Sequence, residues 1–120
     1  MQLGAGFSKA EIYDGPFALS YDEEEETINI KSGFLSRNGE WRTVSSGSID
    51  IISDGYVCVR TKLENQEWTE PEFVIAEPDS ENYPIGYCSL SEGDVKVTSY
   101  RVPVAVFIIA GNCEDEETMA

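Results

Sequence analysis

Histidine is absent from this chain of 120 residues, and basic residues are few. Without an imidazole, a Ser-His or Cys-His nucleophilic pair and a histidine-ligated zinc site are both excluded. Eight lysines and arginines stand against 23 aspartates and glutamates, which gives a formal net charge of -15. A surface of that sign repels phosphate backbones and anionic headgroups, so we expect neither nucleic acid nor a membrane as a partner.

Cysteine is also scarce. Cys58, Cys88 and Cys113 lie far apart, with no CxxC spacing. The first two fall within predicted strands, so we expect both to be buried free thiols. An odd number of cysteines favours assembly in a reducing compartment over secretion. Residues 1–6 show neither the charged nor the apolar region of a signal peptide.

No apolar run is long enough to cross a bilayer. The longest, Val102 to Ala110, falls far short of the ~20 residues that a spanning helix needs. It follows two strand patterns that are joined by a turn at Glu92-Gly93-Asp94, and it ends at Gly111-Asn112. A run this apolar predicts a strand that is covered on both faces.

Long stretches of helix formers are absent too, whereas β-branched and aromatic residues are plentiful. Turn residues recur at short intervals, and no helical period is visible. Short strands are expected early in the chain at Phe17 to Tyr21 and Thr27 to Lys31. We count about eight short strands in all, which predicts an all-β fold, an antiparallel sandwich or barrel.

The clearest local signal is the Asn38-Gly39 dipeptide between two strand patterns. Both residues tolerate positive φ, which favours a tight two-residue hairpin. With that turn, Arg37 lies opposite Glu40 and Ser36 opposite Trp41. We then expect Phe34, Trp41 and Thr43 on one face of the hairpin, and Leu35, Arg37, Glu40 and Arg42 on the other.

A second hairpin is predicted from Ser48–Ile52 and Tyr56–Leu63, joined by a turn at Asp54-Gly55. A further strand, Trp68 to Ala76, is interrupted by Pro71. Because proline lacks a backbone N–H, that interruption indicates an edge strand or a late strand start.

The length fits one domain. We divide the chain into an extended N-terminal arm at 1–16, a β domain at 17–113 and an acidic C-terminal tail at 114–120. The acidic runs, Asp22 to Glu26 and Glu114 to Glu117, are expected to be a solvated loop and a solvated tail. Neither has the spaced oxygen ligands of a calcium loop, so no metal site is predicted.

No residue is assigned a catalytic role, and no cofactor is expected, because most acids fall in loops and tails and the usual motifs are missing. The large aromatic residues are the better candidates for contacts to a ligand or partner. These side chains either form a platform for a sugar or serve as core and interface residues. The residues in question are Trp41, Trp68, Tyr13, Tyr56 and Tyr83.

The order of the elements carries a resemblance. It runs from the hairpin SGFLSRNGEWRTV through DGYVCVRTKL and YPIGYCSL to the final VPVAVFIIAGNC. This order is similar to that of small β modules in the virions of tailed bacteriophages, in head fibres, tail fibres and baseplate-associated proteins. The similarity covers roughly residues 27 to 113 and rests on element order and turn residues, with no catalytic or metal motif.

The resemblance implies a non-enzymatic virion structural protein that is assembled in the host cytoplasm. It implies a homo-oligomer, with a trimer as the first expectation, and attachment to other virion proteins. A Gly-rich N-terminal arm would suit docking onto a particle. A carbohydrate-binding or receptor-binding module that contacts a host surface glycan is the alternative.

Overall fold

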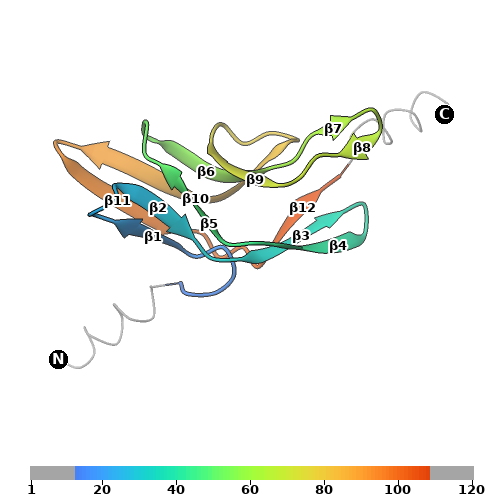
Figure 1. Cartoon of the computed structure of the whole chain (residues 1–120), viewed down its shortest axis with the longest axis horizontal. Helices are drawn as coiled ribbons and strands as arrows, with labels where there is room; N and C mark the ends of the chain where they lie inside the picture. The colour runs from blue at the N-terminus through green and yellow to red at the C-terminus, as the bar shows by residue number, and fades with distance from the viewer. Residues whose placement is uncertain (1–12, 109–120) are drawn as a thin grey trace.

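The structure is a computed structural model that describes residues 13–108. It confirms the all-β prediction (Figure 1). The twelve strands are β1 (Leu19–Asp22), β2 (Thr27–Ile30), β3 (Gly33–Arg37), β4 (Glu40–Val44), β5 (Gly47–Asp50), β6 (Gly55–Arg60), β7 (Leu63–Glu64), β8 (Glu67–Trp68), β9 (Glu72–Ile75), β10 (Asn82–Ser91), β11 (Asp94–Ser99) and β12 (Val104–Phe107).

One long hairpin forms the first layer. Its register is continuous, from Arg37 opposite Glu40 at the turn to Thr27 opposite Asp50 at the far end. Asn38 and Gly39 have φ values of 49° and 90°, which confirms the tight turn and the predicted register. β2 and β3 make up one arm of the hairpin, and β4 and β5 make up the other.

The predicted second hairpin is wrong. β5 pairs with β2, and β6 pairs instead with β9 and β10. The Asn-Gly hairpin continues through β5, and β6 belongs to the second layer, where Val57 and Val59 enter the core. Residues 51–54 therefore cross to the second layer, where the Asp54 carboxylate accepts a hydrogen bond from the N–H of Leu90 at 3.0 Å.

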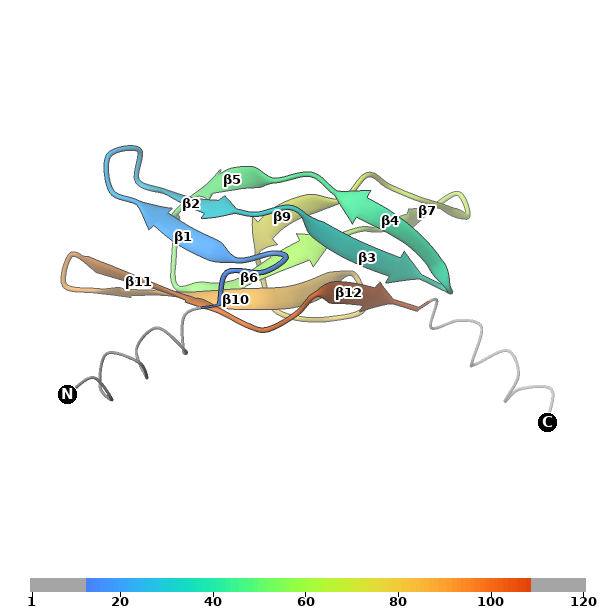
Figure 2. The ribbon, with the colours of Figure 1, turned by 90° about the horizontal axis from the view of Figure 1, so that it is seen from below.

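The two layers form a sandwich (Figures 1 and 2). The first contains β1-β2-β5 and β12-β3-β4, and the hairpin supplies β2 and β5 to one of these sheets and β3 and β4 to the other. The second layer has the order β11-β10-β6-β9. At the edges, β1 lies along β11 and β5 along β9. The N–H of Leu19 donates to the hydroxyl of Ser99 at 2.8 Å, and a Cβ at Gly86 would meet the Leu19 side chain. Glycine is therefore required where these edges meet.

Apolar side chains from both layers form the core. Ile28 and Leu35 come from the hairpin, and Val57, Val59 and Ile85 from the second layer. Phe17, the first residue after the predicted arm, is fully buried. Residues 1–12 of that arm, Cys113 and the acidic tail lie outside the described residues.

The final strand differs from its prediction. β12 covers only Val104–Phe107 and pairs in parallel with β3. Ala105 and Phe107 are buried, whereas Val106 and the following Ile108 are 47% and 59% exposed. The strand is thus covered on one face and not on both, because the second layer packs against the inner side of its sheet alone.

Three other local predictions are confirmed. Glu92 and Gly93 form the turn between β10 and β11 with positive φ. Pro71 separates β8 from β9, and β9 is an edge strand, as expected. Residues 23–26 of the first acidic run are exposed, in a turn where Asp22 accepts hydrogen bonds from the N–H groups of Glu24 and Glu25.

Candidate interaction surface

The five aromatic residues singled out in the sequence do not form one platform. Trp68 and Tyr83 both pack against Phe107, with ring centroids 6.2 and 6.1 Å from it. Tyr13 lies near the Arg101 guanidinium, 5.7 Å from ring centroid to Cζ. Trp41 alone is strongly exposed, at 63%. The fold therefore does not bring these five residues together as one surface on which a sugar could stack.

Tyr56 belongs to a cluster on the outer face of the second layer. Its ring meets that of Tyr87 edge to face, with centroids 5.0 Å apart. Burial raises the pKa of Tyr100, with smaller electrostatic contributions from Tyr56, Tyr87 and Cys58. The Cys58 thiol is fully buried, and its Sγ lies 3.5 Å from the carbonyl oxygen of Ala76. On this face, therefore, the thiol is closed off from solvent while the tyrosines stay half-buried.

Burial raises the pKa of the Cys58 thiol to about 11, with a further contribution from the negative charge of Asp79. Burial also raises the pKa of Cys88. Both cysteines are free and buried, as predicted. A thiol held in its neutral form is a poor nucleophile, so this site offers no reactive cysteine.

The outer face of β12-β3-β4 holds most of the exposed large apolar side chains of the described residues. The register places Phe34 beside Val104, Ser36 beside Val106 and Trp41. Four of the six large apolar side chains that are exposed lie on it: Phe34 at 43%, Trp41 at 63%, Val106 at 47% and Ile108 at 59%. We call these four residues the apolar face. A contiguous patch of this kind marks an interaction site more often than it marks bare surface.

The apolar face carries no charged side chain, because Glu40, Arg42 and Arg37 all belong to the opposite side of the sheet. The remaining residues of the outer side in these strands are Ser36, Thr43 and Val104. In a chain of net charge -15, an uncharged surface is where another protein meets the least local charge repulsion.

Arg37 is a feature that the sequence did not predict. It is the last residue of β3, and its side chain points into the protein with only 4% of the residue exposed. Its Nε and Nη1 atoms are buried without a hydrogen-bond partner. Its Cζ lies 5.5 Å from the centroid of the Trp68 ring, and burial lowers the pKa of the guanidinium. The sequence predicted Glu40 as the partner of the Arg37 guanidinium. The structure adds a cation–π contact with Trp68, which stabilises the same group.

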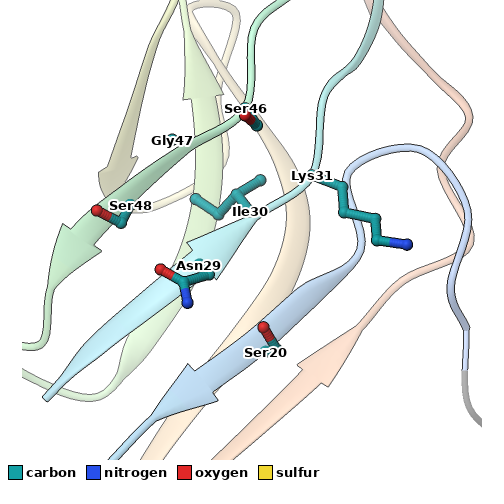
Figure 3. A pocket seen from close by; sticks show the side chains of 7 residues that line it. All are labelled: Ser20, Asn29, Ile30, Lys31, Ser46, Gly47 and Ser48. Carbon is teal, nitrogen blue, oxygen red and sulfur yellow. The ribbon is translucent and has the colours of Figure 1, made fainter. Parts of the chain in front are cut away.

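The other half of the same layer is polar. Ser20, Asn29 and Ser48 lie side by side on β1, β2 and β5, as Figure 3 shows. They border an open hollow of about 420 Å³, lined also by Ile30, Lys31, Ser46 and Gly47. The Lys31 ammonium is paired with Asp14 at 2.6 Å. The hollow offers hydroxyl and amide groups but no aromatic ring for a sugar to stack on.

Within the described residues, no cluster of acidic residues and cysteines is arranged to hold a metal ion. The same part of the chain contains no helix with the length and apolarity needed to span a membrane. No protein-family model matches the chain, and neither a curated protein nor a solved structure is detectably similar to it.

Proposed function

We propose that the chain is a non-enzymatic bacteriophage virion structural protein, a fibre, tail or capsid-associated module that acts through oligomerisation and through binding to other virion proteins. The observation that carries the proposal is the apolar face. Phe34, Trp41, Val106 and Ile108 present an uncharged surface on an otherwise strongly acidic protein.

Protein association is the use that such a face fits best. Burial of exposed apolar area drives association, and aromatic residues are enriched where interfaces are strongest. Trp41 and Phe34 supply the aromatic groups, while Val106 and Ile108 supply a flat aliphatic surface. The virion itself is suggested by the element order of residues 27 to 113, which resembles the small β modules of tailed phages.

Purified virions test the biological part of the proposal. Mass spectrometry of density-gradient-purified particles should recover the chain at a fixed ratio to the other structural proteins. Recovery only from the soluble lysate would contradict it.

A matched pair of variants tests the surface. Phe34→Ser removes an exposed aromatic ring from the apolar face, whereas Ser48→Ala alters the polar half of the same layer. We expect Phe34→Ser to be lost from particles while its melting temperature stays close to that of the wild type. Ser48→Ala should be incorporated normally, and equal incorporation of both variants would count against the apolar face.

The alternative function is glycan or receptor binding, and the polar hollow beside Ser20, Asn29 and Ser48 is the observation that favours it. Its hydroxyl and amide groups match the hydrogen-bonding needs of a sugar. A glycan array would reveal a specific ligand, and Asn29→Ala should abolish that binding. If the array shows no ligand, the hollow is simply polar surface.

A further inference from the structure

The first four residues of β4, Glu40 to Thr43, are all exposed. Exposure of both sides of a strand indicates an edge without cover. The other edges of the sandwich are matched, since β1 lies along β11, β5 along β9 and β12 along β10. Among the described strands, β4 is hydrogen-bonded to β3 alone. Near Val44 the edge borders a cavity of about 310 Å³, lined by Thr43, Val44, Ser45, Ser46, Glu70 and Pro71.

The free backbone groups of this edge can be identified from the far side of β3. The N–H of Asn38 donates to the carbonyl of Phe107 on β12, at 3.1 Å. The backbone groups of successive residues alternate between the two sides of a strand. Arg37 and Leu35 therefore direct theirs toward β4, where they face Glu40 and Arg42. The N–H and C=O groups of Trp41 and Thr43 consequently point away from β3, toward the open edge.

We propose that β4 of a second copy of the chain pairs antiparallel with this edge, about a twofold axis at Trp41. Trp41 of each copy exchanges both backbone hydrogen bonds with Trp41 of the other. The two indoles, each 63% exposed in one chain, then lie side by side on the outer face. This inference rests on the proposed function and deepens it, because it names a second copy of the chain as one partner and an edge strand as the contact.

Charge complementarity selects this register. With the axis at Trp41, Glu40 of each copy lies opposite Arg42 of the other, on the inner side of the joined sheet. An axis at Arg42 would place two arginines opposite each other, and one at Glu40 would place two glutamates there. Glu40 and Arg42 are both exposed, and neither forms an ion pair with another described residue. The twofold symmetry creates each opposite-charge pair twice.

The dimer joins two three-stranded sheets into one sheet of six strands and leaves Phe34, Val106 and Ile108 of both copies exposed. The apolar face therefore stays available to another virion protein. A trimer, the symmetry implied by the resemblance, cannot be closed by an isologous edge contact, since that contact is used up by two copies. The mass of the purified protein distinguishes the two arrangements.

Light scattering of the full chain at micromolar concentration is the first measurement, and we expect twice the 13.3 kDa mass of one chain. Glu40→Arg and Arg42→Glu each place like charges opposite one another across the axis. Each should raise the dissociation constant of the dimer at least ~10-fold. The double variant E40R/R42E restores opposite charges, and it should restore the dimer.

Glu64→Arg on β7 and Lys96→Glu on β11 are the matched controls, because they make the same charge changes at exposed positions away from the edge. They should leave the mass unchanged, and a melting curve of each variant shows that it is folded. A monomeric wild type, or a double variant that stays as weak as the single ones, would overturn the edge contact.

The edge contact and the proposed function fail in different ways. A trimer that is insensitive to the charges on β4 but is lost in Phe34→Ser would overturn the edge contact and leave the structural role intact. A dimer that follows the charge-swap pattern, in a protein that never enters particles, would establish the edge and remove the virion role.

Discussion

The two outer faces of the sandwich carry similar aromatic residues but different cover. On the second layer, Tyr56 and Tyr87 pack edge to face and are half-buried, and the Cys58 thiol is fully buried. On the first layer, Trp41 and Phe34 are 63% and 43% exposed. Aromatic content alone therefore does not separate a face that the chain closes from a face that it leaves open.

Within the first layer, the two halves of the outer face also differ. One register runs the whole length of the hairpin, yet its outer side is polar at Asn29 and Ser48 and apolar at Phe34 and Trp41. The difference is one of side chains and not of backbone. The polar half needs no cover, whereas burial of the apolar half against a partner would be favourable.

The largest effect is expected from the inner side of the apolar half. Leu35 is fully buried and its neighbour Phe34 is 43% exposed, so truncation of the two should differ sharply. Leu35→Ala leaves a cavity and should cost ~2–5 kcal/mol of unfolding free energy, while Phe34→Ala should cost less than about 1 kcal/mol. Urea titration of both variants gives the comparison, and equal losses would show that Phe34 is part of the core.

The stability of the fold at alkaline pH tests whether solvent reaches Cys58 on the outer face of the second layer. The pKa of Cys58 is raised from 9.0 to about 11, so the folded state disfavours the thiolate. The stabilisation is complete below about pH 9 and is lost as the pH rises toward 11, because the unfolded chain releases its proton first. Unfolding free energy should fall by up to roughly 2 kcal/mol over this interval.

Cys58→Ala provides the control for that measurement. Tyr100, whose pKa is also raised by burial, contributes a slope of its own in this range. The difference between the wild type and Cys58→Ala isolates the thiol. Identical slopes would mean that solvent reaches Cys58 and that the face over it is open.

The matched aromatic pair sharpens the comparison of the two faces. Tyr56 is half-buried and meets Tyr87 edge to face, so Tyr56→Ala should cost ~1–2 kcal/mol of unfolding free energy. Trp41 is exposed, and in the monomer Trp41→Ala should cost only a few tenths of a kcal/mol. Thermal melts at a concentration low enough for the monomer separate the two, and a large loss in Trp41→Ala would place its indole in the fold.

The turn at Asn38-Gly39 should give an effect no larger than that of Tyr56→Ala. Gly39 has a φ of 90°, and nothing lies within 4 Å of the position that a Cβ would take. Gly39→Val is thus opposed by the backbone alone, at ~1–2 kcal/mol. Gly39→Asn is the control, since asparagine tolerates positive φ, and it should melt close to the wild type. A valine variant as stable as the wild type would mean that the turn adapts.

Local chemistry determined much of this protein from the sequence. The abundance of β-branched and aromatic residues and the closely spaced turn residues predicted the all-β class. Asn38-Gly39 fixed the turn and the register of its hairpin, because those effects act over a few residues. The burial of Cys58 and Cys88 and the interruption at Pro71 followed from the same kind of pattern. The absence of histidine alone excluded a Ser-His or Cys-His nucleophilic pair and a histidine-ligated zinc site.

Tertiary pairing decided the rest. Nothing local shows that β5 continues the first hairpin, that β12 runs parallel to β3, or that Arg37 turns inward beneath Trp68. The run from Val102 to Ala110 reads as buried on both faces, because sequence reports how apolar a strand is but not how many layers cover it. With two layers in the described chain, the second side of β12 is left open, and that is where the apolar face lies.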